Sequence, residues 1–156
     1  MRILVVEDIE QQAEWLCGEL RKRHKAAKVD HVRTESEFHA RVEQFRKNPP
    51  DLAIIDMMLA WSDPMLEVPD APSDVTDDGR RAGLRCIRLL RADPRSAKIR
   101  IIIRTVLEDI DFDEGEVPDD VPLVTKESDS EGLFQVIRKA LTEHAEENRK
   151  PAPRLR

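Results

Sequence analysis

Five side chains that can take part in ion binding or phosphoryl chemistry follow or interrupt short apolar runs in this sequence: Glu7, Asp8, Asp56, Thr105 and Lys126. Three of them are carboxylates, which are the ligands that a hard divalent cation such as Mg²⁺ prefers. A carboxylate beside such a metal can act as a nucleophile towards a phosphoryl group. A lysine and a hydroxyl can offset the charge on the transferring oxygens. The set therefore has the composition that phosphoryl transfer to an aspartate requires.

The apolar runs that carry these side chains predict β-strands over residues 2–6, 51–59, 99–105 and 121–125, with Asp56 at the point where the strand within 51–59 should end. A short, polar run over 28–33 predicts a fifth, edge-like strand. Apolar residues at helical spacing predict helices over 10–24, 35–47, 79–91 and 130–147, with Thr34 as an N-cap and Glu37 completing a capping box. The alternation predicts an α/β fold in which a doubly wound parallel sheet of five strands is covered by helices on both faces. Ligands of such sheets bind beyond the carboxyl ends of the strands, so the five side chains should meet at one edge.

Composition limits the classes of function. The chain of 156 residues is long enough for one domain with a core, and its net charge of −6 argues against nucleic acid as the main partner. No apolar run approaches the roughly 18 residues of a membrane span, and no signal peptide precedes the first strand. We therefore expect a cytoplasmic protein that binds no membrane. Cys17 and Cys86 lie in helix-like patterns, so we expect buried free thiols rather than a disulfide or metal ligands.

Two acidic segments interrupt the pattern of strands and helices. Residues 60–78 hold six carboxylates, three prolines and no Lys or Arg, and we interpret them as an insertion in a single domain over 1–147. This insertion is a solvated loop, a docking surface for a partner or a lid over Asp56. Residues 108–120 hold eight carboxylates and no basic residue, so we expect no stable helix there. This second segment is either a solvated loop or a contact surface for a basic partner. Residues 148–156 are expected to be a flexible tail.

The order of these residues and their places at the strand ends resemble the receiver domain of response regulators. The resemblance covers residues 2 to about 147. It is carried by Val5-Val6-Glu7-Asp8, Ile54-Ile55-Asp56-Met57-Met58, Asp78-Gly79, Thr105 and Lys126. It implies a flavodoxin-like sheet with the strand order 2-1-3-4-5. It also implies a role in two-component signalling.

The resemblance assigns a role to each of the strand-end residues. It implies a Mg²⁺ site formed by Glu7, Asp8, Asp56 and the backbone carbonyl of Met58. Asp56 would accept the phosphoryl group, the hydroxyl of Thr105 would move towards it, and Lys126 would pair with it. The implied function is that of a stand-alone receiver, phosphorylated by a histidine kinase or a phosphotransfer protein. Such a receiver would act on no other substrate and would signal through contacts with a downstream protein, whose identity is unknown.

Three features depart from the receiver pattern. Leu123 stands where receivers carry an aromatic residue three positions before the lysine, and Glu127 stands where they carry proline. In addition, 22 positions separate Met57 from Gly79 (79 − 57), whereas loops between a strand and a helix commonly take about 2–6. The metal and nucleophile residues are intact, but the usual threonine–aromatic coupling lacks its ring. Leu123 and Glu127 favour an alternative, a receiver-like adaptor that binds a partner through its acidic loops without phosphorylation. A Mg²⁺-dependent phosphohydrolase that acts on an external substrate is a third hypothesis. Met58 opposes it, because aspartate phosphatases carry a second acid at the position two residues after the nucleophile.

Overall fold

A parallel β-sheet forms the centre of the molecule. The computed structural model describes residues 1–65, 70–73, 75, 79–108 and 111–149. Five strands lie in the order β2-β1-β3-β4-β5, and their bounds are Arg2–Val6 for β1, Lys28–Val32 for β2, Leu52–Ile55 for β3, Arg100–Thr105 for β4 and Leu123–Thr125 for β5. Every neighbouring pair is parallel. The predicted fold class and strand order are therefore confirmed.

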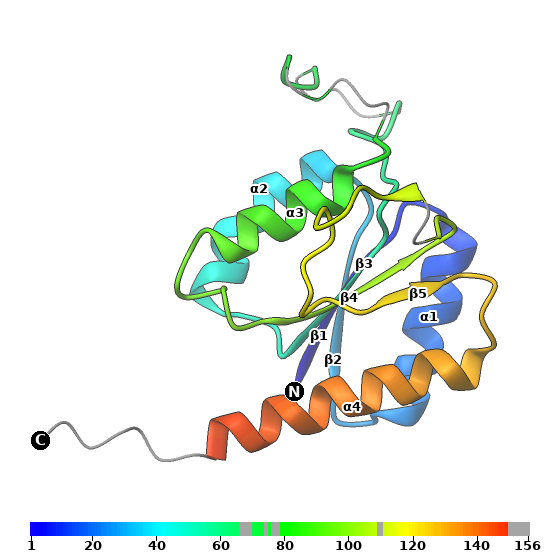
Figure 1. The fold of residues 1–156 in the computed structure, drawn as a ribbon, viewed down its shortest axis with the longest axis vertical. Coiled ribbons are helices and arrows are strands. Elements are labelled where there is room, and N and C mark those ends of the chain that lie inside the picture. Colours follow the sequence, from blue (N-terminus) through cyan, green and yellow to red (C-terminus); the bar gives the residue numbers. More distant parts are fainter. Residues whose placement is uncertain (66–69, 74, 76–78, 109–110, 150–156) are drawn as a thin grey trace, which may run out of the picture.

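Within the described residues, four helices cover the two faces of this sheet. They are α1 (Glu10–Arg23), α2 (Glu35–Lys47), α3 (Ala82–Arg91) and α4 (Ser130–Arg149). Figure 1 shows α1 and α4 on one face and α2 and α3 on the other. The described part of the acidic segment between β4 and β5 contains no α-helix, as its charge predicted. Helix α4 continues two residues beyond the predicted end at 147, and residues 150–156 of the expected tail lie outside the description.

Alternate residues of the central strands enter two separate hydrophobic cores, because successive side chains of a strand point to opposite faces. Leu52 and Ile54 pack with residues of α1 and α4, whereas Ala53 and Ile55 pack with residues of α2 and α3. All four positions of β3 are buried, which is what a central parallel strand requires. The strand ends at Ile55, so the residue after it stands at the edge of the core rather than inside it.

The helix starts follow the sequence signals only in part. The Thr34 hydroxyl accepts a hydrogen bond from Glu37 N–H at 3.2 Å and so caps α2, as predicted. The Glu37 carboxylate, however, accepts from Arg33 N–H at 2.9 Å, one residue earlier than a capping box places it. Helix α3 begins at Ala82 rather than at 79. Gly79 instead adopts φ +81° in a tight turn, where a Cβ would lie 2.2 Å from the Leu59 carbonyl oxygen.

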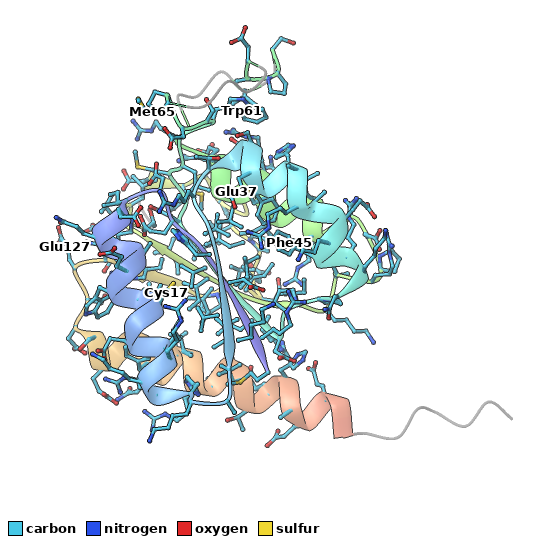
Figure 2. The ribbon with its side chains drawn as sticks, turned by 180° about the vertical axis from the view of Figure 1, so that it is seen from behind. Cys17, Glu37, Phe45, Trp61, Met65 and Glu127 are labelled. Carbon is cyan, nitrogen blue, oxygen red and sulfur yellow. The ribbon has the colours of Figure 1, made fainter. Side chains whose placement is uncertain are left out.

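The insertion leaves the body of the molecule beside the first turn of α2. The N–H groups of Glu35 and Ser36 donate to the carbonyls of Ala60 and Trp61 at 3.0 and 2.8 Å. Figure 2 shows Trp61 and Met65 beyond the end of this helix, and the Met65 side chain is 88% exposed. Residues 66–69, 74 and 76–78 lie outside the description, so the loop, docking and lid interpretations of 60–78 stay predictions.

Two further expectations concern the thiols and the membrane. Cys17, labelled on α1 in Figure 2, and Cys86 are both buried and free, as expected. Burial raises the pKa of both thiols, which makes them poor nucleophiles. Among the helices described, none is both long enough and apolar enough to cross a bilayer.

Candidate functional site

The carboxylates singled out in the sequence meet at one edge of the sheet. Glu7 and Asp8 follow β1, and Asp56 follows β3, the neighbouring strand. Backbone hydrogen bonds continue the pairing past the strand ends, from Glu7 N–H to Val32 O (3.0 Å) and from Asp56 N–H to Val6 O (2.9 Å). One oxygen from each of the three carboxylates lies within 4.8 Å of the others. Glu7 and Asp56 are buried and Asp8 is half-buried, so the cluster opens to solvent on the Asp8 side.

Lys126 is the cation between two of these carboxylates. Its Nζ donates to Asp56 Oδ2 at 2.7 Å and lies 2.7 and 2.9 Å from the two oxygens of Glu7. The side chain is only 6% exposed. Its backbone N–H donates to the Thr105 carbonyl at 2.7 Å, which ties the residue after β5 to the end of β4. The lysine is therefore held at the acids by its backbone as well as by its charge.

Burial sets the electrostatics of Glu7. Removal from water raises the pKa of its carboxyl group, and the nearby charge of Asp56 raises that pKa further. The contact with Lys126 and the hydrogen bond from Ile9 N–H oppose this rise without cancelling it. Burial therefore makes the ionised form of Glu7 less favourable, and a cation bound at the cluster would stabilise that form.

Backbone donors hold the remaining oxygens of the cluster. Met58 N–H donates to Asp56 Oδ1 at 3.2 Å, and Ala60 N–H donates to Asp8 Oδ2 at 2.9 Å. Both donors belong to the turn that follows β3. Gly83, in the first turn of α3, allows this turn to pack closely, because a Cβ there would lie 2.4 Å from the Asp56 carbonyl oxygen. The role of the Met58 carbonyl as a metal ligand stays a prediction.

Thr105 lies at the end of β4, as the sequence predicted, and is fully buried. Its hydroxyl accepts a long hydrogen bond of 3.4 Å from Leu107 N–H. Strand alternation places its side chain on the same face as Ile101 and Ile103, which belong to the core under α2 and α3. The hydroxyl therefore serves the turn after β4 in this state, and its movement towards a phosphoryl group stays a prediction.

Sequence reasoning missed a second cation at this edge, Arg104. Its side chain is 7% exposed, and its Nη1 lies 3.7 Å from Glu7 Oε2. Its Nη2 donates to Gln12 Oε1 at 2.9 Å, and its guanidinium lies 5.2 Å from the ring centroid of Trp15. Burial lowers the pKa of Arg104, and the charges of Glu7 and Asp56 oppose this effect. The available signal was a basic residue inside the apolar run of β4.

A second ion pair that the sequence did not predict joins the helices on the other face. Arg85 stands on the polar side of the α3 sequence pattern, yet it is half-buried and forms two hydrogen bonds, of 2.6 and 2.9 Å, with Glu35. The Glu35 side chain is fully buried, so it needs this partner. Arg81 of the loop before α3 pairs with Glu116 of the acidic segment at 2.6 Å.

The donor set fits a hard divalent cation. The three clustered ligand atoms are all carboxylate oxygens, and the described part of the site contributes no sulfur or imidazole to them. Three carboxylates against Lys126 and the more distant Arg104 leave the cluster with a net negative charge when all are ionised. An ion of the Mg²⁺ class would therefore be held by Glu7, Asp8 and Asp56.

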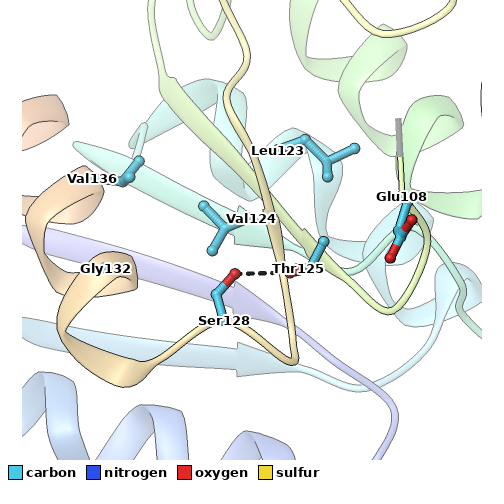
Figure 3. A pocket seen from close by; sticks show the side chains of 7 residues that line it. All are labelled: Glu108, Leu123, Val124, Thr125, Ser128, Gly132 and Val136. Atoms are coloured by element: carbon cyan, nitrogen blue, oxygen red, sulfur yellow. Dashed lines mark hydrogen bonds between the residues drawn. The ribbon is translucent and has the colours of Figure 1, made fainter. Parts of the chain in front are cut away.

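Leu123, which stands in place of the receiver aromatic, lies at the start of β5 and is half-buried. It lines a shallow groove of about 630 Å³ between β5, α4 and Glu108, shown in Figure 3. The hydroxyls of Thr125 and Ser128 hydrogen-bond to each other at 2.7 Å across the floor of this region. The sheet edge beside the site is therefore open to an approaching molecule.

Comparisons with known proteins agree on the fold. No protein-family model matches the sequence, and no curated protein matches it. Among solved structures, the signal receiver domain of a signal transduction histidine kinase from Syntrophus aciditrophicus is 24% identical, with a TM-score of 0.65, and the match covers 99% of this chain and 97% of that one. The signal receiver domain of a DNA-binding response regulator from Colwellia psychrerythraea is 17% identical, with a TM-score of 0.65, over 91% and 98% of the two chains. A putative response regulator from Chloroflexus aurantiacus is 21% identical, with a TM-score of 0.61, over 90% and 97%. The chain therefore has the fold of receiver domains.

Proposed function

We propose that this chain is a response-regulator receiver that accepts a phosphoryl group on Asp56 from a histidine kinase or a phosphotransfer protein, in a reaction that requires Mg²⁺. One observation carries the proposal. A buried carboxylate at a strand end lies 2.7 Å from a buried ammonium and within 4.8 Å of two further carboxylates, Glu7 and Asp8. A nucleophile, a metal-binding set and a cation for the phosphoryl oxygens are thus assembled in one place on a receiver fold.

Each residue of the site has a separate role in the phosphoryl transfer. A carboxylate oxygen of Asp56 attacks phosphorus, the P–N bond of the donor phosphohistidine breaks, and its electron pair stays on the imidazole nitrogen, which is then protonated. Glu7, Asp8, Asp56 and the Met58 carbonyl would hold Mg²⁺, which when bound offsets negative charge on the transferring oxygens. Lys126 Nζ already contacts Asp56, so it is placed to pair with a phosphoryl oxygen once Asp56 carries the group. The Thr105 hydroxyl would supply a further donor.

The phosphorylated state ends when water hydrolyses the acyl phosphate, so the chain is a phosphoacceptor and not an enzyme for external substrates. Phosphorylation shifts a two-state equilibrium by adding charge beside Lys126 and the ends of β4 and β5. Signalling then proceeds in the cytoplasm through contact with a downstream protein at the surface around these strands. Leu123 and the groove beside it belong to that surface.

An adaptor function independent of phosphorylation is the alternative, and two observations favour it. The aliphatic Leu123 offers no ring that could swing with Thr105, and the described part of 111–120 exposes Asp111, Asp113 and Glu114. Such a surface can bind a basic partner in either state of Asp56. The intact acid cluster with Lys126 opposes this alternative, because a constitutive adaptor has no need to bury it.

One experiment separates these functions. The protein is incubated with Mg²⁺ and acetyl phosphate, and its intact mass is measured. We expect a mass increase equal to one phosphoryl group, which is absent in Asp56→Asn and without Mg²⁺. The matched control Asp113→Asn removes an exposed carboxylate of the acidic segment and should be modified like the wild type. A wild type that stays unmodified with acetyl phosphate and with beryllofluoride would contradict the proposal and favour the adaptor. Turnover of unrelated phosphate esters would favour a hydrolase.

A further inference from the structure

We propose that Arg104 is a second phosphoryl-binding cation of the site, which weakens Mg²⁺ binding in the unphosphorylated state and holds the phosphoryl group once Asp56 carries it. This inference rests on the proposed function and adds to it a residue that acts in opposite directions on the two ligands. It starts from the place of Arg104 in the sheet rather than from its charge alone.

The strand register directs Arg104 towards the phosphoacceptor. Strands β3 and β4 pair Ile54 with Ile102 and Ile55 with Ile103, so the next step in register places Asp56 beside Arg104. Ile54 and Ile102 both belong to the core under α1 and α4. Side chains two positions further along parallel strands continue on the same face, and so Asp56 and Arg104 share this face. Thr105, one position later, continues on the opposite face.

The guanidinium of Arg104 has a free donor at the acid cluster. Its Nη1 is buried and has no hydrogen-bond partner within the described part of the chain, while Glu7 Oε2 lies 3.7 Å away, too far for a hydrogen bond. A buried unpaired N–H on a charged group is costly, so the arrangement gains from any acceptor that arrives. Gln12 and the ring of Trp15 hold the rest of the guanidinium in place. The donor is therefore pre-positioned and not merely nearby.

Lys126 and Arg104 also line the same cavity on this side of the sheet. Both line a cavity of about 260 Å³ next to Gln12, Trp15 and Ser128, and no carboxylate lines it among the residues described. The acid cluster opens to solvent on the Asp8 side, whereas the two cations that lie beside it also line a cavity with neutral hydrogen-bond donors. An anion that reaches Asp56 meets both cations, whereas a metal ion at the carboxylates is repelled by both.

The two ligands consequently respond to Arg104 with opposite signs. A guanidinium close to Glu7 makes no favourable contact with a divalent cation held there. Like-charge repulsion from the guanidinium weakens the binding of that cation. A phosphoryl group on Asp56 brings about two negative charges and three acceptor oxygens. Arginine is well suited to such a group, because its planar donors match the oxygens. Removal of Arg104 should therefore tighten the metal and loosen the phosphoryl analogue.

The test compares Arg104→Gln with the wild type in two titrations, both in a Trp61→Phe background so that Trp15 fluorescence reports the site. In the first, Mg²⁺ alone is added, and the variant should bind it about threefold to tenfold more tightly. In the second, beryllofluoride is added at saturating Mg²⁺, and the variant should bind it about tenfold or more weakly. Arg104→Lys, which keeps the charge and loses the planar fork, should restore the Mg²⁺ constant towards the wild type more fully than the beryllofluoride constant.

Arg100→Gln is the matched control, because it removes the same charge from the other end of the same strand, where Arg100 pairs with Glu147. Both of its constants should equal those of the wild type. Equal constants for Arg104→Gln and the wild type would overturn the role of Arg104 while leaving the proposed function intact. Weakening of both ligands in Arg104→Gln, with a lowered melting temperature, would reduce Arg104 to a structural role and also overturn it. A wild type that binds no beryllofluoride at saturating Mg²⁺ would refute the proposed function itself.

Discussion

Replacement of Lys126 by methionine tests whether the acid cluster is held together by this one cation. The substitution keeps the length and apolar stem of the side chain and removes the ammonium from Glu7 and Asp56. Each contact at 2.7 Å is worth about 6 kcal/mol of gross attraction at an effective dielectric constant of about 20. The ammonium must be taken out of water, which offsets most of this attraction. Loss of one partner from a buried ion pair therefore costs about 3–5 kcal/mol in practice.

We expect Lys126→Met to lower the free energy of unfolding by that amount, measured by urea denaturation at neutral pH without divalent ions. Mg²⁺ should then stabilise the variant more than the wild type, because the metal replaces the missing cation and no longer competes with it. Lys22→Met is the control: the Lys22 side chain is 75% exposed, and within the described residues it pairs with Glu19 alone, so its loss should cost less than about 1 kcal/mol. A cost for Lys126→Met similar to that of the control, or equal stabilisation of both proteins by Mg²⁺, would refute the reasoning.

Three further predictions concern the frame of the site. Arg85→Met should cost about 3–5 kcal/mol in urea unfolding because it leaves the buried Glu35 with only His39, 3.7 Å away, as an ionisable partner among the described residues, whereas Glu35→Gln should cost clearly less. Gly83→Ala gains about 1 kcal/mol of helix propensity, but its Cβ would lie 2.4 Å from a backbone oxygen after β3, so a net loss of stability is expected. The Arg95 side chain lowers the pKa of Asp93 to about 2, so the stability that Asp93 contributes is present above its unfolded pKa of about 4 and disappears as the pH falls towards 2. Urea midpoints of Asp93→Asn and the wild type should therefore differ at neutral pH and converge in acid; a difference that persists at low pH would contradict this origin.

The strands, the helices and the edge of the sheet at which the site residues meet could be predicted, because they depend on local sequence patterns. Short runs of β-branched residues predicted the strands, and the 3.6-residue spacing predicted the helices, to within a few residues. The position of Asp56 followed from the length of the run before it, since a strand that is buried on both faces ends where the first charge appears. Parallel strands then place their carboxyl ends at one edge, and so Glu7, Asp8 and Lys126 could be expected beside Asp56 without knowledge of any contact.

The two arginine contacts could not be predicted, because each depends on packing between elements far apart in the sequence. Arg85 stands on the polar side of α3 in a helical pattern, and only the approach of α2 makes that side an interior. Arg104 interrupts an apolar strand, and the sequence pattern alone does not predict that its side chain is buried. Its burial needs Gln12 and Trp15 of α1 on one side and Glu7 on the other. A charged residue in a buried strand was nevertheless a usable signal, since a buried charge demands a partner.

A hydrogen bond from the backbone of the insertion to Asp8 connects the insertion with the acid cluster. Metal binding at the cluster could therefore affect other parts of the protein. Asp8 Oδ2 accepts the N–H of Ala60, so a metal that pulls on the Asp8 carboxylate would also pull on this hydrogen bond. The carbonyl of the same Ala60 accepts from Glu35 N–H, in the first turn of α2. Glu35 in turn carries the buried ion pair with Arg85 of α3. A displacement of Asp8 would therefore act through Ala60 on the start of the insertion and on the first turn of α2, without involving Thr105 or Leu123. Among the described residues, this is one route of continuous hydrogen bonds from the acid cluster to α2 and α3.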